Sequence, residues 1–268
     1  MEIEFFPPAS YREYGNNLLP PKQEAGSAGV TGDIWRSSIV RVWFPNGGTI
    51  TLVQGGFNAV GQTSGTGTNA IATTPGSTNF ELSMYRILSG TATGGAGNSG
   101  GYTMQTFAYW LGNAAGLGGF RVEYLCGIEA MGSAGRVWWG LTITVTSATT
   151  SIEPSTQTNC IGVGADSTDT NLQIMRNDNV GTCTKVDTGI PKATVGTYLT
   201  VISAGQNANS VTVQIIGKGG AASFGPQTYS TDIPQNTAFM NPQHNATATA
   251  AVNPAQMHFM HLLTEQPF

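Results

Sequence analysis

Apolar and polar residues alternate at every second position in several short segments, and no segment keeps a helical period over three turns. The clearest alternation lies in residues 141–146, 171–175 and 211–216. Successive side chains of a strand point to opposite faces of its sheet, so a period of two is typical of half-buried β-strands. Clusters of Gly, Pro, Asn and Asp between the segments favour turns. The chain therefore predicts an all-β fold, an antiparallel β-sandwich of jelly-roll-like type.

The composition indicates a packed domain with an uncharged polar surface. Hydrophobic residues make up 40% of the 268 residues and can build a core, whereas charged residues make up only 10%, against ~25% in ordinary soluble domains. Glycine accounts for 36 residues, about twice the usual share. Hydroxyls and amides are expected to cover many turns in place of charges. Residues 31–268, which contain no internal repeat, are predicted to form one β-sandwich domain.

Residues 1–30 differ from the rest of the chain. The proline pairs Pro7-Pro8 and Pro20-Pro21 fix an extended backbone and forbid a helix. The segment is too irregular to fold alone, yet it carries six apolar side chains: Phe5, Phe6, Tyr11, Tyr14, Leu18 and Leu19. We predict an extended N-terminal attachment arm that buries these side chains on a partner protein, a neighbouring subunit or its own domain. A disordered tail is the alternative.

Two further strand predictions rest on local patterns. Residues 39–44 and 49–52 alternate on either side of Pro45-Asn46-Gly47-Gly48, which predicts a hairpin because Asn-Gly readily adopts the positive φ of a tight turn. A last strand is expected to place Met257, Phe259, His261 and Leu263 on one side.

Residues 55–79 and 89–101 are rich in Gly, Ser, Thr and Asn, and we predict long surface loops there, with a strand from 79 to 88 between them. Loops often carry recognition on sandwich scaffolds. These two segments are therefore the predicted contact surface, with packing against other subunits as the alternative.

The charge pattern argues against two classes of partner. The net charge is −4 and the 11 Lys and Arg residues are scattered, whereas a nucleic-acid surface needs grouped cations. No apolar run approaches the ~20 residues of a membrane span. The residues from Met1 to Pro8 are acidic and reach proline at once, unlike a secretory signal. We expect no nucleic-acid partner and no membrane insertion.

The three cysteines, Cys126, Cys160 and Cys183, are odd in number and lack the C-x-x-C spacing. Neither a disulfide framework nor a zinc ribbon is indicated. Each cysteine lies in or beside an apolar strand pattern, so buried free thiols are expected.

Residues 97–101 match G-x-S-x-G, the nucleophile elbow, around Ser99. The elbow requires a strand-to-helix turn and a nearby base, and a strand-like segment follows instead. His258 and His261 are expected on opposite faces of a strand, which disfavours a metal site within one chain, although a three-fold axis would repeat each histidine. His244 is the third histidine, and a packed or solvated role is expected.

Asp166, Asp169, Asp178 and Asp187 form an acidic cluster in sequence, but the calcium-loop pattern D-x-D-x-D-G is absent, so turn chemistry is the preferred interpretation. Five tryptophans could stack on sugars or fill a core: Trp35, Trp43, Trp110, Trp138 and Trp139. Trp138 and Trp139 are adjacent and must face opposite ways, which predicts one in the core and the other at a subunit interface or the surface. We expect no catalytic residue, no cofactor and no metal ligand.

Residues 166–189, which read DSTDTNLQIMRNDNVGTCTKVDTG, resemble a module of virion fibre proteins of tailed bacteriophages. Residues 110–120, 136–141 and 153–156 are also similar to that module, as is the tail from Thr231 to Leu263. The resemblance covers roughly residues 31–263 and is strongest from 110 to 190. It implies a β-sandwich on a trimeric fibre, located in a virion that is assembled in the cytoplasm of its bacterial host.

Three functions are compatible with this setting. The first is a short tail or head fibre, which attaches by residues 1–30 to other virion proteins and contacts a host-surface glycan through a homotrimeric sandwich. The alternative is a capsid decoration or cement protein that stabilises the head. The third, a surface-glycan hydrolase, has the least support from the sequence.

Overall fold

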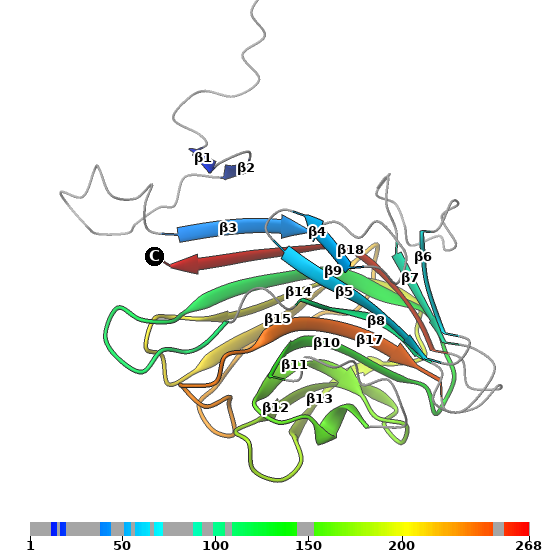
Figure 1. Cartoon of the computed structure of the whole chain (residues 1–268). Helices are drawn as coiled ribbons and strands as arrows, with labels where there is room; N and C mark the ends of the chain where they lie inside the picture. The colour runs from blue at the N-terminus through cyan, green and yellow to red at the C-terminus, as the bar shows by residue number, and fades with distance from the viewer. Residues whose placement is uncertain are drawn as a thin grey trace, which may run out of the picture.

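The computed structural model of the chain describes residues 12–14, 17–19, 38–43, 51–54, 57–64, 67–71, 88–92, 99–104, 109–143, 153–248 and 255–267. Two antiparallel sheets pack face to face in these ranges (Figure 1). The predicted all-β sandwich is confirmed. No helix in the described ranges has the length and apolar character needed to cross a bilayer.

The sheets are named here after their central strands. The β10 sheet has the spatial order β13 (Thr184–Pro191), β12 (Asn171–Asn177), β11 (Cys160–Ala165), β10 (Arg136–Thr142), β17 (Asn241–Thr247), β8 (Ser99–Met104), β5 (Phe57–Ser64) and β4 (Thr51–Gln54). The β9 sheet has the order β16 (Phe224–Tyr229), β15 (Val211–Lys218), β14 (Gly196–Ala204), β9 (Phe120–Met131), β18 (Ala255–Pro267), β7 (Leu88–Ala92) and β6 (Thr68–Ile71). A 3-10 turn, η2 (Pro154–Thr156), precedes β11.

Within residues 1–30, β1 (Arg12–Tyr14) and β2 (Asn17–Leu19) pair with each other in a small antiparallel hairpin. Part of the predicted arm thus folds back on itself. The other residues of the arm, including Phe5 and Phe6, lie outside the described residues.

The hairpin predicted for residues 39–52 is wrong. β3 (Ser38–Trp43) pairs with the C-terminal half of β18, and the two run side by side in Figure 1, whereas β4 pairs with β5 in the other sheet. The pairing with β18 buries Val40 and Trp43. This long-range burial outweighs the local preference of the Asn-Gly turn.

The prediction of loops at 55–79 and 89–101 is wrong where the structure describes these residues, because β5, β6, most of β7 and the first half of β8 lie there. Residues 72–79 and 93–98 fall outside the described residues. Their small residues allow the backbones to pack closely. A Cβ added to Gly101 would lie 2.2 Å from the carbonyl oxygen of His244, and one added to Gly67 would lie 1.9 Å from that of Ser99. Glycine in these segments therefore reflects close packing of the chain. The strand predicted from 79 to 88 falls outside the described residues except for Leu88, the first residue of β7.

The expectation that Met257, Phe259, His261 and Leu263 share one side of the last strand is wrong, because β18 contains a bulge. Phe259 pairs with Cys126, but the register then shifts so that His261 pairs with Leu125. The bulge reverses the alternation: Phe259 and Leu262 are buried in the core, while His261 and Leu263 are only half-buried. His258 pairs with Gly127, two residues from Leu125, so His258 and His261 share one face, contrary to the sequence-based expectation.

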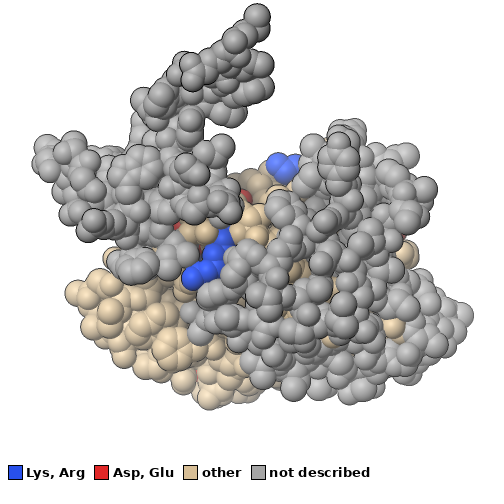
Figure 2. Space-filling model, turned by 45° about the horizontal axis from the view of Figure 1, so that its top comes forward, with Lys and Arg blue, Asp and Glu red and all other residues tan. Residues whose placement is uncertain are grey.

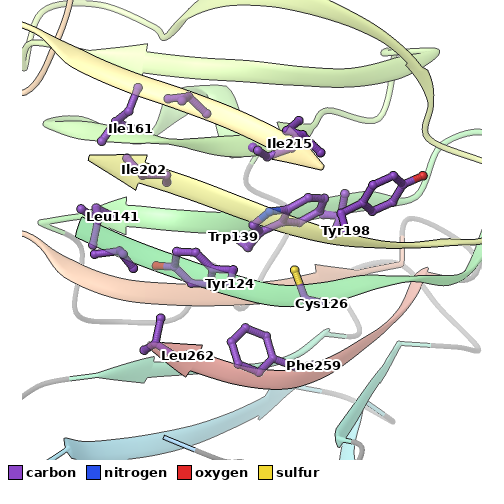
Figure 3. Close-up of a cluster of buried hydrophobic side chains, with 14 of the residues drawn as sticks. Tyr124, Cys126, Trp139, Leu141, Ile161, Tyr198, Ile202, Ile215, Phe259 and Leu262 are labelled. Carbon is purple, nitrogen blue, oxygen red and sulfur yellow. The ribbon is translucent and has the colours of Figure 1, made fainter. Parts of the chain in front are cut away.

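Buried hydrophobic side chains from both sheets pack together in the core (Figure 3). Hydrogen bonds also cross from one sheet to the other. The hydroxyl of Tyr124 on β9 donates to the carbonyl of Gly140 on β10 at 2.7 Å. The indole N–H of Trp139 on β10 donates to the hydroxyl of Thr200 on β14 at 3.0 Å. These bonds satisfy polar groups that would be costly to bury alone.

His244 on β17 lies within this core. Its ring stacks on Phe259 with centroids 4.1 Å apart and on Tyr102 at 5.6 Å. The ring of Trp43 completes the cluster, with its centroid 6.4 Å from that of His244. Burial lowers the pKa of His244 to about 3, because a charged imidazolium is disfavoured among apolar rings.

Acid should therefore destabilise the fold through His244. The folded pKa lies below the ordinary value near 6.5, so the unfolded chain binds the proton more tightly, and stability falls as pH drops from about 6.5 towards 3. The slope for one such histidine is about 1.4 kcal/mol per pH unit. We expect His244→Phe to reduce the slope of the free energy of unfolding between pH 6 and 4 by about this amount, as measured by urea titration at several pH values. An unchanged slope would contradict the neutral, buried histidine.

Trp138 lies on the outer face of the β10 sheet, in a satellite cluster with Cys160, Met175 and Cys183. A Cβ on Gly162 would meet its indole at 2.8 Å, and one on Gly164 would meet it at 3.1 Å. The glycines of β11 thus leave the space that the indole of Trp138 occupies. The expectation that one of the adjacent tryptophans lies at a subunit interface or the surface is wrong, because Trp138 and Trp139 are each 0% exposed within the chain.

Substitution of Gly162 by alanine should destabilise the protein by about 1–3 kcal/mol, because the added methyl group meets backbone atoms as well as the indole. Gly205→Ala is the matched control, since its Cβ would meet nothing closer than 3.9 Å. Thermal unfolding of both variants checks the prediction. Equal unfolding midpoints for the two variants would contradict the close packing of the Trp138 indole on Gly162.

Candidate functional site

The acidic cluster is held by cations and turns. The amine of Lys185 contacts Asp166 at 2.6 Å and Asp169 at 2.8 Å. Asp169 also accepts the N–H of Asp166 at 2.8 Å. Asp178 and Asp187 accept N–H groups two residues ahead, from Val180 and Gly189. These are contacts of turn residues, as the sequence predicts.

Lys192 was missed by sequence reasoning. Its side chain is buried, and its amine donates to the carbonyls of Asp166 at 2.8 Å, Ser167 at 3.2 Å and Gly135 at 3.2 Å. An ammonium group thus supplies positive charge inside the acidic region. Across the ranges that the structure describes, no group of three or more His, Cys, Asp or Glu residues could hold a metal ion.

The other residues singled out from sequence are dispersed. Ser99 is 2% exposed and begins β8, between β17 and β5, so it does not lie on the strand-to-helix turn that an elbow requires. Cys126 lies in the main core, whereas Cys160 and Cys183 meet in the satellite cluster.

Trp110 is the tryptophan that differs from those buried in the cores. It is half-buried, and its ring packs against the 56% exposed Phe239 with centroids 5.0 Å apart. Tyr109, just before it, pairs with Met240, just after Phe239, in an isolated bridge. This bridge brings the two aromatic residues together from distant parts of the chain. Trp35 falls outside the described residues.

Glycines shape the loop that follows Trp110. Gly112, Gly116, Gly118 and Gly119 all have positive φ, which glycine adopts without steric cost. The loop closes on itself, because the N–H of Gly119 donates to the carbonyl of Trp110 at 2.9 Å. It also exposes the side chain of Leu117.

The same loop contacts a second loop, residues 205–210. The N–H of Asn207 donates to the carbonyl of Leu117 at 2.8 Å, and the side chain of Gln206 donates to the carbonyl of Gly116 at 2.9 Å. Both loops lie at the end of the sandwich where the chain has its C-terminus (Figure 1).

A cavity of about 380 Å³ opens at this end, beside the second loop. Short polar groups and two charged residues line it: Ser203, Ser210, Thr212, Arg121 and Glu265. The guanidinium of Arg121 is also paired with Glu123 at 2.5 Å. Figure 2 shows few charged side chains on the described part of the face that it presents.

We define the candidate site as the loop end: the Trp110–Phe239 pair, the two contacting loops and the cavity. Trp110 and Phe239 lie at the same end of the sandwich as the cavity but do not line it. An exposed aromatic side chain and a cavity lined by hydroxyls are both features suited to ligand binding. Sequence reasoning placed recognition at residues 55–79 and 89–101 instead. The glycine run of residues 112–119 was the available local signal, whereas Phe239 and Glu265 are brought there only by long-range pairing.

No protein-family model matches the chain, and no curated protein sequence matches it. Solved structures are similar in fold. Arcelin-5, a lectin-like defence protein from Phaseolus vulgaris, is 10% identical with a TM-score of 0.55, over 87% of this chain and 99% of that one. Lectin UEA-II, in complex with galactose, is 12% identical with a TM-score of 0.52, over 85% of this chain and 98% of that one.

A protein of unknown function from Shewanella oneidensis MR-1 is also similar, with 12% identity and a TM-score of 0.53, over 86% of this chain and 87% of that one. The fold of this chain is therefore that of the legume-lectin β-sandwich. At these identities the similarity concerns the fold alone.

Proposed function

We propose that this protein is a non-enzymatic phage virion protein, a short tail or head fibre whose β-sandwich binds a host-surface glycan. The similarity of residues 110–190 to a fibre module supports the setting, and the low content of charged residues suits a particle surface. Residues 1–30 attach the protein to other virion proteins in this proposal, and the sandwich forms a homotrimer.

The observation that carries the binding role is the contact of the half-buried Trp110 with the exposed Phe239, at the same end of the sandwich as a polar cavity. Aromatic rings offer flat apolar faces on which the C–H groups of a sugar ring can lie. Hydroxyls of Ser203, Ser210 and Thr212 can exchange hydrogen bonds with sugar hydroxyls, while Arg121 and Glu265 provide a charged donor and acceptor. The cavity volume is in the range of small-molecule sites.

The fold similarity supports the same class of ligand without identifying it. UEA-II binds galactose in its solved structure, so a sandwich of this kind can carry a sugar site. We place the site of this chain at the loop end because the half-buried Trp110 and the exposed Phe239 meet there.

We expect Phe239→Ala and Trp110→Ala each to weaken binding to the host-surface polysaccharide at least about tenfold, because truncation of an aromatic anchor removes much of a small interface's affinity. Val180→Ala is the matched control, since Val180 is 73% exposed on the β12–β13 turn and does not line the cavity. Binding of purified polysaccharide is measured by calorimetry, with thermal unfolding to verify the fold. Unchanged affinity in both variants of the pair would remove the loop end as the binding surface.

The free protein should have three times the mass of one chain, 28.0 kDa, when measured by light scattering at micromolar concentration. Low surface charge leaves apolar and hydroxyl-rich faces that subunits can bury against one another. A monomeric mass would contradict the homotrimer for the free protein while leaving the glycan site testable.

A further inference from the structure

Cys160 and Cys183, 23 positions apart in the chain, lie with their sulfur atoms 3.4 Å apart. Both thiols are directed at the same acceptor, the carbonyl of Gln157, at 3.6 Å from Cys160 and 3.4 Å from Cys183. The pair is enclosed by Trp138 and Met175 on the outer face of the β10 sheet. Two thiols held on one acceptor, outside the main core, form a cluster that the proposed binding function does not use.

Elements with different constraints hold the two cysteines. Cys160 begins β11 between two neighbours, opposite Thr142 of β10 and Asn177 of β12. Cys183 ends the turn between β12 and β13, where its N–H donates to the carbonyl of Ser155 at 2.7 Å. Residues 179–182 of that turn are exposed. One sulfur is therefore held within a sheet, whereas the other lies at the base of an exposed surface turn.

We propose that Cys160 and Cys183 are a thiol–disulfide modification site, which a small-molecule disulfide such as oxidised glutathione converts into an internal disulfide bond. The sulfurs must approach from 3.4 Å to a bond length of about 2.0 Å. Movement of the exposed turn supplies this approach. The inference is independent of the glycan-binding proposal, because the cysteines do not line the loop-end cavity.

The reaction proceeds in two exchanges. The Cys183 thiol loses its proton and attacks one sulfur of the oxidant, whose S–S bond breaks and releases one glutathione thiolate. The Cys160 thiolate then attacks the Cys183 sulfur of the mixed disulfide and releases the second glutathione. Both protons pass to the released thiolates, so two protein thiols are oxidised and one glutathione disulfide is reduced to two thiols.

Exposure decides which cysteine reacts first. Cys183 is 8% exposed and is joined to the exposed turn, whereas Cys160 and Cys126 are 0% exposed. Cys126 lies in the main core between the sheets, away from the satellite cluster. It is expected to stay a thiol throughout and serves as an internal reference.

The internal disulfide would tie the start of β11 to the β12–β13 turn. A cross-link over a loop of this length restricts the unfolded chain and should raise the unfolding midpoint by about 5–10 °C. Glutathione pools keep such a pair reduced in the cytosol, whereas an oxidising exterior favours the disulfide. The fold would thus gain stability on leaving a reducing compartment.

The test incubates the reduced full-length protein with oxidised glutathione and then alkylates the remaining thiols after unfolding. Mass spectrometry should find one alkylated cysteine, Cys126, and a peptide cross-linked between Cys160 and Cys183. The oxidised protein should unfold at the higher temperature, and dithiothreitol should reverse both changes. Cys126→Ala should behave like the wild type, whereas Cys183→Ala should show neither the cross-link nor the rise in midpoint.

Three alkylated cysteines after incubation, under conditions that oxidise the urea-unfolded chain, would overturn the proposal. A glutathione adduct on Cys183 that never resolves into the cross-link would overturn it as well. Both results come from the wild-type protein, so the test does not depend on how well the variants fold.

Discussion

Hydrogen bonds that buried side chains make across the core set the geometry of this sandwich. Tyr124 reaches across the core to the backbone of Gly140, Trp139 reaches back to Thr200, and Tyr109 bonds the hydroxyl of Thr264 at 2.8 Å. An apolar core alone tolerates sliding of one sheet over the other, because hydrophobic contacts are non-directional. A buried hydroxyl or indole N–H without its partner costs free energy, so these bonds permit one offset of the sheets. Tyr109 also belongs to the bridge that delivers Trp110 and Phe239 to the loop end, so the same constraint positions the candidate site.

The all-β class of the chain could be predicted from its sequence, because it depends on the local alternation of polar and apolar residues. In β15, Val211, Val213 and Ile215 are buried while the residues between them are half-buried, as a period of two predicts. The β12–β13 hairpin follows from the Asn and Gly residues of its turn, and the structure contains it. What could not be read locally was which strand pairs with which. The partner of β3 is more than 200 residues away, and the bulge of β18 leaves no mark in the pattern of apolar residues.

The structural role of glycine differs most from the role that the sequence predicts. In the run Gly112 to Gly119 its usual interpretation holds, since positive φ angles there build a loop. In β8 and β11, however, Gly101 and Gly162 lie inside strands, where a Cβ would collide with a neighbouring backbone or with Trp138. Composition cannot separate these two uses, because both raise the glycine content equally. The distinction depends on what packs above each residue, which only the tertiary structure reveals. This is why the predicted binding loops at 55–79 and 89–101 contain strands, and why the candidate site was missed.

The segment that most resembles the fibre module divides physically into two parts. Residues 153–192 form a dense polar network. Lys185 pairs with the carboxylates of Asp166 and Asp169, and Lys192 donates to backbone carbonyls. The acidic residues of the segment accept hydrogen bonds within turns. Few of its polar groups are left to meet a ligand, so its regularity is best explained by stability. Residues 110–120 have the opposite character: left-handed glycines, an exposed leucine and a half-buried tryptophan, arranged beside a cavity. Exposed apolar groups on the hydrogen-bonded end of a sandwich lower solubility, a cost that the proposed binding role would offset. Under the proposed function, variation among related chains should concentrate around Trp110, Leu117 and Phe239, because changes there would alter ligand choice. Lys185 and Lys192 should stay fixed, because their replacement would leave carboxylates and carbonyls of the β12–β13 region without partners.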